Sequence, residues 1–259
     1  MTPLTSGNTR VKEARKLHRR SVRSERRCFL ADGPKAVEGA LSVPDCVVEV
    51  FATPAAAVEH ADLLGGTPVT LVDERALAGL SDSVSPAGVV AVCRFLDAPL
   101  ATALGGRLVA ICADVRDPGN AGTVVRTADA AGASGVVLAG DAVDLYNPKT
   151  IRASVGSAFH LPVAIERDPE AAVRAARAAG LQVLAADGAG EIGLFDDDAL
   201  LARPTAWLFG NEARGLPAEL AALADHRVSI PILGHAESLN LATAAAVCLY
   251  ASARAMMGA

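Results

Sequence analysis

Short apolar runs alternate with amphipathic stretches along the whole chain, and this alternation predicts an α/β protein. In the first third, three Val-rich runs predict strands at 46–52, 69–72 and 88–95. The remaining stretches of this part predict helices at 11–27, 35–41, 55–64 and 73–80. The helix at 11–27 offers few apolar positions, so we expect little of it to pack on a core.

The rest of the chain alternates strand and helix more regularly. Strands are expected at 107–115, 135–139, 182–186, 205–209 and 226–230, and helices at 121–131, 148–158, 170–179 and 239–255. Buried strands alternating with helices predict a mostly parallel sheet with helices on both faces. A proline and paired glycines predict a linker at 97–106, between a small α/β domain at 1–96 and a larger domain at 107–259.

Charge is distributed unevenly along the chain, whose net charge is −5. Residues 1–30 hold nine Lys or Arg against two Glu, a net charge of +7, so the remaining residues carry −12. A basic N-terminal arm on an acidic body favours phosphate binding confined to one region. The alternative is a helix face that is simply solvated.

Composition excludes several classes of protein. The chain lacks the run of about 20 strongly apolar residues that a membrane span needs, and it has no segment with the order of a signal peptide. We therefore expect a cytoplasmic protein. The five cysteines are scattered, odd in number and without a Cys-x-x-Cys pair, which predicts free thiols and no zinc or other metal site.

Three loops rich in glycine, proline and polar residues lie where a predicted strand runs into a turn. They read Asp117-Pro-Gly-Asn-Ala-Gly-Thr-Val-Val-Arg126, Leu208-Phe-Gly-Asn-Glu-Ala-Arg-Gly215 and Ile230-Pro-Ile-Leu-Gly-His-Ala-Glu-Ser-Leu-Asn-Leu241. Ligands of open α/β sheets bind outside the carboxyl ends of the strands. The loops therefore predict a ligand site at that edge of the sheet.

Each loop also has a purely structural interpretation. Asn120 is expected at the N-cap of one helix, with Arg126 as a surface residue about a turn and a half further on. Ser238 is expected at the N-cap of the last helix, and Glu212 could be a solvated carboxylate. Asn240, just inside that helix, is harder to explain as structure, because Asn is a mediocre helix former.

A glycine motif at 188–193 fits the Gly-x-Gly-x-x-Gly pattern of dinucleotide-binding loops. It is followed by the acids Asp196-Asp-Asp198, whose charge would repel a diphosphate at a helix start. The motif also lies late in its domain and not in the first βαβ unit. We therefore expect no nicotinamide cofactor.

The three loops, in this order and over residues 107–255, resemble the motifs of the SpoU (TrmH-like) RNA 2′-O-ribose methyltransferases. The resemblance implies a deep C-terminal trefoil knot, a homodimer and S-adenosylmethionine as the cofactor. It implies an active site at the acceptor ribose made of Asn120, Arg126, Glu212, Ser238 and Asn240. It implies that the cofactor lies against Leu208, Gly210, Ile230, Ile232 and Leu239.

Arg126 is expected to act by its charge in such an enzyme. A guanidinium keeps its proton, with a pKa above about 12, so use as a base would require unusual desolvation. We expect Arg126 to stabilise the developing alkoxide and to hold the adjacent phosphate.

Two further segments resemble RNA-binding parts of these enzymes. The first 41 residues are similar to their substrate-binding domain, which resembles a ribosomal RNA-binding protein, and residues 146–160 match the segment expected along the RNA backbone. The implied RNA-binding residues are Arg10, Lys12, Arg15, Arg19, Arg23, Lys149 and Arg152. The expected partner is 23S ribosomal RNA in preference to transfer RNA, with protection against a ribosome-directed antibiotic left open. The alternative is a non-catalytic RNA-binding or ribosome-assembly factor on the same scaffold.

Overall fold

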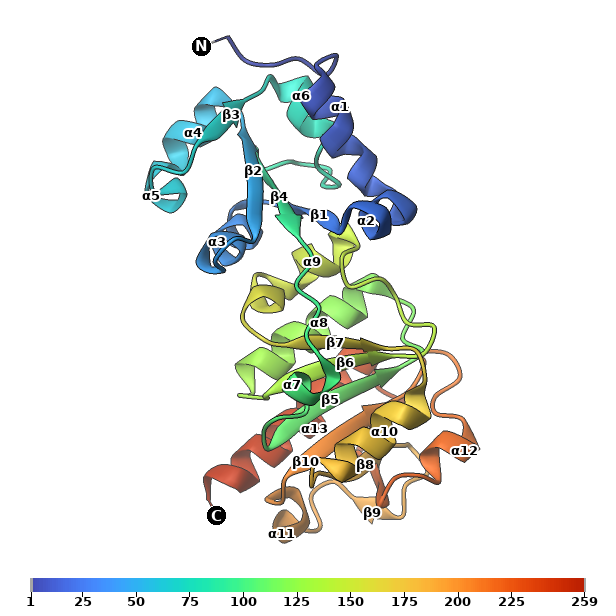
Figure 1. The fold of residues 1–259 in the computed structure, drawn as a ribbon. Helices are drawn as coiled ribbons and strands as arrows, with labels where there is room; N and C mark the ends of the chain where they lie inside the picture. Colours follow the sequence, from blue (N-terminus) through green and yellow to red (C-terminus); the bar gives the residue numbers. More distant parts are fainter. Residues whose placement is uncertain (1, 259) are drawn as a thin grey trace. The chain divides into compact units, whose positions relative to one another are not determined.

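The chain forms two compact units in the computed structural model, which describes residues 2–258 (Figure 1). The N-terminal unit comprises the chain up to Leu96 together with Asp144–His160. The C-terminal unit comprises Asp97–Val143 and the chain from Leu161 onward. The segment expected as a linker, 97–106, thus begins the second unit, and it contains the short helix α7 (Leu100–Ala103).

The N-terminal unit is built on a four-stranded mixed sheet of order β1-β4-β2-β3. Its strands are β1 (Cys28–Asp32), β2 (Val47–Ala52), β3 (Val69–Leu71) and β4 (Val89–Arg94). Its helices are α1 (Thr9–Arg15), η1 (Lys16–His18), α2 (Arg20–Arg26), α3 (Pro34–Ser42), α4 (Pro54–Glu59), α5 (Ala61–Leu64), α6 (Glu74–Ala78), α9 (Pro148–Ser154) and η2 (Ser157–Phe159). β4 pairs antiparallel with β1 and β2, whereas β2 and β3 are parallel.

The basic N-terminal segment differs from the single, loosely held helix expected at 11–27. It breaks at Arg19, whose backbone is extended (φ −85°, ψ 125°), so that α1 and η1 end there and α2 begins. Val11, Ala14 and Leu17 are buried against the sheet and α6, in a core with Leu77. The spacing of these three residues puts them on one helix face, and this face anchors the segment.

The segment at 144–160 belongs to the N-terminal unit, although the sequence placed it in the larger domain. Tyr146 is 1% exposed, and its ring centroid lies 4.7 Å from that of Phe29 and 3.7 Å from that of Phe95. Phe159 packs on Phe29 as well, with the ring centroids 6.0 Å apart. The expected helix at 148–158 ends early, because Val155 and Gly156 both have positive φ. Aromatic packing therefore attaches the segment 144–160 to β1.

The C-terminal unit is built on a seven-stranded sheet of order β7-β6-β5-β10-β8-β11-β9. Its strands are β5 (Leu108–Ala113), β6 (Gly135–Ala139), β7 (Val163–Glu166), β8 (Gln182–Ala186), β9 (Ile192–Gly193), β10 (Thr205–Phe209) and β11 (His226–Ser229). Its other helices are α8 (Pro118–Ala130), α10 (Pro169–Ala178), α11 (Asp198–Leu201), α12 (Ala218–Ala221) and α13 (Leu241–Met257). Each of its strand pairs is parallel, so every strand ends at the same edge of the sheet.

Helices cover both faces of this sheet, as the strand–helix alternation predicted (Figure 1). One face packs on α7 and α10, in a core that includes Val173, Ile111 and Leu208. The other face packs on α8 and α13, where the Trp207 indole N–H donates a hydrogen bond to Ser252 Oγ at 2.9 Å. The loops after β5, β10 and β11 emerge between these layers and carry the three motifs.

Candidate active site

The first loop places an aspartate, and not the expected asparagine, at the N-cap of α8. Asp117 has extended backbone and its Oδ1 accepts from the Asn120 N–H at 2.8 Å, with Pro118 at the first helical position. Asn120 therefore lies inside the first turn. Because Asp117 satisfies the helix end, the Asn120 side chain is left for other partners.

Glu212, in the second loop, joins that loop to the first. Its carboxylate accepts from the backbone N–H groups of Arg116 at 3.1 Å and Asp117 at 3.0 Å, and from Asn120 Nδ2 at 3.2 Å. Partial burial works to raise the pKa of Glu212, but these donors outweigh it and hold the pKa below the ordinary value. Glu212 is thus an ionised carboxylate that fixes the start of α8, and not only a solvated turn residue.

Asn240 adds the third loop to this network. Its Oδ1 caps α13 by accepting from the N–H groups of Ala242 at 2.9 Å and Thr243 at 3.3 Å. Its Nδ2 donates to Asn120 Oδ1 at 3.0 Å. The expectation that Ser238 caps this helix is wrong, since α13 begins two residues later than expected, at Leu241. Asn240 therefore does have a structural explanation, and it contacts the first loop as well.

Arg126 lies on α8, six residues after Asn120. Its side chain is exposed, and within the described residues no hydrogen bond or ion pair engages its guanidinium. The polar network described above thus holds Asn120, Glu212 and Asn240 together, and it does not include Arg126 or Ser238. An exposed cation that has no protein partner is available to a ligand.

A cavity of about 360 Å³ opens beside this network. Its walls come from the carboxyl ends of β8, β10 and β11 and from the start of α13. Of the residues expected at a ligand, it is lined by Gly210, Glu212, Ile230, Ile232, Ser238 and Leu239. Asn120, Arg126 and Asn240 do not line it, and Leu208 is fully buried in the core between the sheet and α10.

The sequence missed part of this wall. Ala186, Asp187 and Gly188, at the end of β8, line the cavity together with Phe209, Asn211 and Glu237. The order of the sheet puts β8 between β10 and β11, so its end lies beside theirs. The glycine motif at 188–193 could have indicated this wall, because its first glycine, Gly188, lines the cavity.

The rest of that glycine motif is structural. Gly190 lies so close to the backbone of Arg227 and Val228 that a Cβ atom would come within 2.8 Å of it. Gly193 ends the two-residue strand β9, and the motif opens no long helix, because the following α11 has four residues. The dinucleotide pattern therefore has no phosphate-binding helix behind it.

The tight return of the second loop requires a glycine at its start, Gly210. The loop folds back so that Asn211 and Gly215 exchange backbone hydrogen bonds of 3.0 and 2.8 Å. A Cβ atom on Gly210 would lie 2.3 Å from the carbonyl carbon of Gly215. A side chain here would displace the backbone at Gly215, which lines the cavity.

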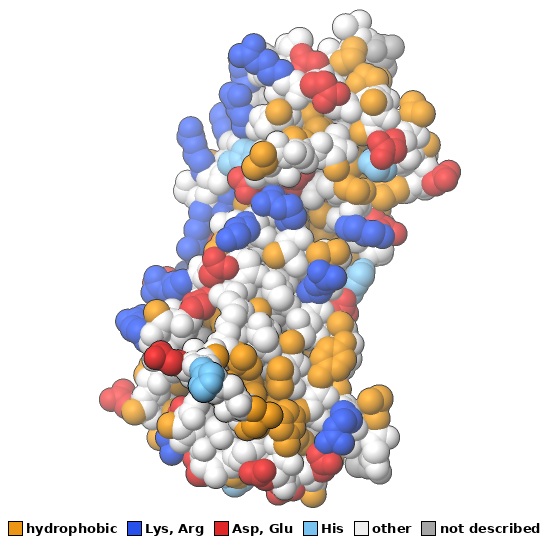
Figure 2. Space-filling model, turned by 180° about the vertical axis from the view of Figure 1, so that it is seen from behind, with side chains coloured by type: hydrophobic (Ala, Val, Ile, Leu, Met, Phe, Trp, Pro, Cys, Tyr) orange, Lys and Arg blue, Asp and Glu red, His pale blue; other side chains and the backbone are white. Residues whose placement is uncertain are grey.

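The expected RNA-binding cations of the N-terminal segment fall into three groups. Lys12, Arg15 and Arg19 are exposed, with no ion pair among the described residues. Arg10 forms an ion pair with Glu49. Arg23 is 3% exposed, because its guanidinium pairs with Asp144 at 2.5 Å and donates to the carbonyls of Leu17 and His18. Figure 2 shows Lys and Arg side chains gathered along one edge of this unit. Because it is buried, Arg23 is not available at the surface.

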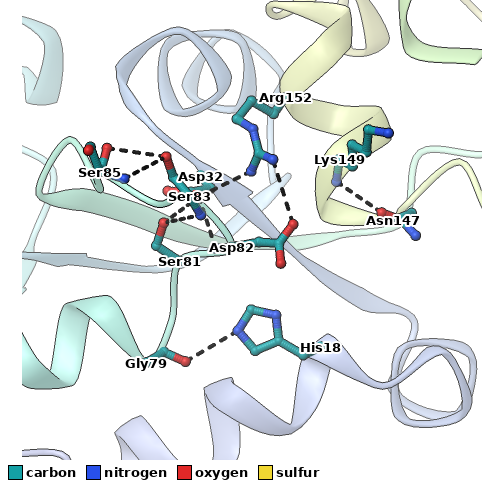
Figure 3. A network of polar contacts seen from close by, with 10 residues as sticks. All are labelled: His18, Asp32, Gly79, Ser81, Asp82, Ser83, Ser85, Asn147, Lys149 and Arg152. Carbon is teal, nitrogen blue, oxygen red and sulfur yellow. Dashed lines mark hydrogen bonds and ion pairs between the residues drawn. The ribbon is translucent and has the colours of Figure 1, made fainter. Parts of the chain in front are cut away.

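Lys149 and Arg152, on α9, have different surroundings. Lys149 is exposed, whereas Arg152 lies between two carboxylates of its own unit (Figure 3). Its Nη1 is 3.8 Å from Asp32 Oδ2, and its Nη2 is 3.6 Å from Asp82 Oδ2. The two side chains therefore do not form the simple phosphate clamp that their spacing predicted.

Within residues 2–258, no group of three or more His, Cys, Asp or Glu side chains is arranged to hold a metal ion. Within the same range, no helix is both long and apolar enough to cross a membrane. All five cysteines are free thiols, and burial raises the pKa of Cys112 to about 12.

Comparison with known proteins identifies the family. Residues 107–250 match the model of the SpoU rRNA Methylase family, and residues 8–91 match that of the MRM3-like substrate binding domain. The chain is 36% identical over 243 residues to the 23S rRNA (guanosine(2553)-2′-O)-methyltransferase RlmP of Bacillus subtilis, which covers 94% of this chain and 95% of the relative. The chain belongs to the SpoU rRNA methylase family.

Two further comparisons agree with this assignment. A 23S rRNA (uridine(2479)-2′-O)-methyltransferase of Streptomyces viridochromogenes is 44% identical over 142 residues, which is 53% of this chain and 49% of the relative. The crystal structure of an AdoMet-bound rRNA methyltransferase from Sinorhizobium meliloti superposes with a TM-score of 0.84 at 36% identity, covering 98% of this chain and 97% of that one. The likeness therefore extends over both units.

Proposed function

We propose that this protein transfers a methyl group from S-adenosylmethionine to a ribose 2′-hydroxyl of RNA, with 23S ribosomal RNA as the substrate in preference to transfer RNA. The observation that carries the proposal is the network of Asn120, Glu212 and Asn240, which joins the three family motifs beside a cavity of about 360 Å³. The relatives named above act on 23S rRNA, which supports the substrate. Because the network of Asn120, Glu212 and Asn240 is intact, it gives no support to the alternative of a non-catalytic RNA-binding factor.

The cavity fits S-adenosylmethionine in size and chemistry. Its volume falls in the range of about 300–1,000 Å³ usual for small-molecule sites. Ile230, Ile232 and Leu239 offer apolar surface to an adenine ring, and Gly210 contributes backbone to the same wall. Asp187 and Glu237 line the same space. The Glu237 carboxylate suits a cofactor that carries a sulfonium and an ammonium group, whereas the Asp187 carboxylate already accepts from the Ala189 N–H at 2.9 Å and lies 3.7 Å from Arg227 Nη1. When bound, the cofactor supplies an electrophilic methyl group.

Arg126 is the residue we assign to the acceptor. Its guanidinium keeps its proton, so it acts as a donor to the ribose oxygen as negative charge develops there, and to the neighbouring phosphate. Its freedom from protein partners supports this role. A cation already tied to a carboxylate would have to break that pair first.

The network residues position the loops around that reaction. Glu212 holds the start of α8 through two backbone N–H groups, and Asn120 links it to Asn240 at the start of α13. Ser238 lines the cavity and is exposed, so its hydroxyl can bind either cofactor or ribose. Fixed donors and acceptors of this kind lower the reorganisation that the reaction requires.

The N-terminal unit is proposed to bind the RNA substrate. The match of residues 8–91 to a substrate binding domain supports this, as do the unpaired cations Lys12, Arg15 and Arg19. Residues 1–96 thus supply RNA binding and 107–259 the methyl transfer, with 144–160 packed on the former unit. We take the first of these units to be like a ribosomal RNA-binding protein.

We further infer a homodimer, a C-terminal trefoil knot and a cytoplasmic location. Exposed apolar side chains include Leu233 (95% exposed) in the loop before α13, and Tyr250 (52%) and Met257 (83%) two turns apart on α13. An apolar patch on this face of the C-terminal unit is visible in Figure 2 and suits contact with a second copy. Relatives that act on ribosomal RNA support the location.

Calorimetry and RNA mapping test the proposed function. Titration with S-adenosylmethionine should give saturable binding, weakened by a bulky side chain at Gly210. Mapping of 2′-O-methyl groups in ribosomal and transfer RNA from cells with and without the gene should show one ribosomal position that depends on it. Absence of cofactor binding at millimolar concentration would favour the non-catalytic alternative, and a gene-dependent position in transfer RNA would overturn the substrate.

A further inference from the structure

A second cavity lies in the N-terminal unit, and its lining is unlike that of the cofactor cavity. It has a volume of about 220 Å³ and is walled by the start of α3, the loop at 83–87 and the end of α9. Asp32 and Arg152 bring one carboxylate and one guanidinium to the same wall, beside Ser83 and Ser85. Pro34, Ala36, Ala87 and Val155 supply apolar surface around them.

Arg152 is incompletely satisfied in this position. Its contacts to the carboxylates of Asp32 and Asp82 are 3.8 and 3.6 Å long, which is beyond hydrogen-bond range (Figure 3). Its Nη1 is buried and has no hydrogen-bond partner. Buried donors are nearly always paired in folded proteins, so this nitrogen marks a place where a partner is missing.

Asp32 offers the complementary group. Its side chain is 5% exposed, and all its contacts are made through Oδ2, which accepts from Ser81 Oγ at 2.6 Å and the Asp82 N–H at 3.2 Å. No hydrogen bond within the described residues uses its Oδ1. Arg152, whose side chain is 39% exposed, and Asp32, whose carboxylate has one unused oxygen, thus place a cation and an anion in the wall of the same cavity.

The rim of the cavity is held in a strained conformation. Val155 has φ +50°, a left-handed conformation that is costly for a β-branched residue. The strain keeps its side chain at the cavity, 41% exposed. Such outliers persist where the surroundings hold them, often at binding sites.

We propose that this cavity binds the base of an unpaired guanosine in the RNA, an inference that rests on the methyltransferase function proposed above. Guanine carries acceptors at O6 and N7, which an arginine can bind, and donors at N1 and N2, which a carboxylate can accept. The apolar rim packs on the ring, as proteins do with bases splayed out of single strands. A phosphate is disfavoured, because it would bring a second anion against the buried Asp32 carboxylate, and Lys35, the other cation of the wall, is paired with Glu38 at 2.8 Å. The site reads a base near the target, separately from the nucleotide that is methylated.

The test measures base preference in the absence of cofactor. The full-length protein is titrated against fluorescent uridine heptamers that carry guanosine, inosine, adenosine or cytidine at the centre. The guanosine heptamer should bind at least about fivefold more tightly than the adenosine heptamer, the lower end of what one two-pronged contact discriminates. Inosine, which lacks the N2 amino group, should fall between them.

Variants of the residues that line the cavity test whether the guanosine preference arises there. Arg152→Gln and Asp32→Asn should each bring the guanosine and adenosine affinities together, and Arg152→Lys should restore only part of the difference. Arg75→Gln removes an exposed cation of the same unit that does not line the cavity, and it should leave the preference intact. Circular dichroism and S-adenosylmethionine binding should be unchanged in each variant. These readouts separate loss of the site from loss of the fold.

Four results would overturn the inference, three of which concern the pattern of base preference. They are equal affinity for all four heptamers, a preference for cytidine, and a guanosine preference that survives both Arg152→Gln and Asp32→Asn. No binding of any heptamer at millimolar concentration would overturn it as well. Because the assay uses no cofactor, these outcomes leave methyl transfer by the wild-type protein unaffected and so distinguish this inference from the proposed function.

Discussion

Asn240 Nδ2 donates a hydrogen bond to Asn120 Oδ1 at 3.0 Å, across 120 residues of sequence. The bond joins the start of α13 to the start of α8, and Glu212 adds the loop after β10 through Asn120 Nδ2 at 3.2 Å. The three motifs are therefore one connected structure. A substitution of any of the three residues should therefore shift the positions of the other two loops.

Removal of the Glu212 charge should loosen this structure. Glu212→Gln keeps the shape but replaces one acceptor oxygen with a donor, so that the N–H groups of Arg116 and Asp117 compete for one oxygen. Hydrogen bonds to a charged group contribute about 1.5–3 kcal/mol, so kcat/KM for methyl transfer should fall about tenfold or more. Steady-state kinetics measure this, with Glu219→Gln, an exposed acid on α12, as the matched control. Equal rates for both variants would contradict the positioning role.

The contribution of Glu212 to folding stability should depend on pH in a defined direction. The pKa of Glu212 is lower in the folded protein than in an unfolded chain, so its stabilising contribution is fully present above the unfolded value of about 4.3. The contribution is lost as the pH falls through the lower, folded value. Thermal unfolding of wild type and Glu212→Gln should therefore differ by a constant amount at neutral pH and converge in acid. A difference in Tm that grows in acid would contradict this sign.

Two variants of Asn240 should separate its role as the N-cap of α13 from its role in the active-site network. Asn240→Asp keeps a good N-cap but loses the donor to Asn120, so stability should be nearly unchanged while methyl transfer falls. Asn240→Ala loses both functions, and its free energy of unfolding should fall by about 1 kcal/mol. Chemical denaturation and single-turnover rates measure the two effects. Full activity of the aspartate variant would reduce Asn240 to a cap.

The N-terminal cations should divide into an RNA-binding group and a structural one. Replacing Lys12, Arg15 and Arg19 by Gln should lower the salt dependence of RNA binding, by about 0.9 in log–log slope for each full contact on duplex-like RNA. Arg23→Gln leaves Asp144 without its buried partner, which typically costs about 3–5 kcal/mol of stability. Its unfolding should be easier, with the salt slope unchanged in the folded protein. An unaltered slope in the triple variant would mean that this face is only solvated.

The sequence predicted five of the seven strands of the C-terminal unit and its long helices α8, α10 and α13, because buried strands and amphipathic helices have distinct periods. It missed the strands β7 and β9 and the short helices α7, α11 and α12. It misplaced both helix caps, since Asp117 and Asn120, or Ser238 and Asn240, are equally good capping residues, and the choice depends on backbone angles. It also gave no strand at β1, where five residues lead directly into a turn. These errors are local.

The larger differences came from contacts between distant segments. The pairing of Arg23 with Asp144 and the packing of Tyr146 on Phe29 tie 144–160 to the N-terminal unit. Neither contact leaves a periodic signal in the sequence. The site residues came from resemblance in motif, and the structure added Asp187 and Gly188 through the order of the strands.

The central claim is that this protein methylates a ribose 2′-hydroxyl of ribosomal RNA with Arg126 at the acceptor. It is tested most directly by single-turnover incubation of deproteinised 23S rRNA with saturating protein and S-adenosylmethionine, followed by mass spectrometry of the nucleosides. The wild type should yield one 2′-O-methylnucleoside per RNA. Arg126→Ala should react about a hundredfold more slowly, with cofactor affinity unchanged, and Arg126→Lys should recover little of the rate. Methylation of a base in place of a ribose, or a near-wild-type rate for Arg126→Ala, would contradict the account.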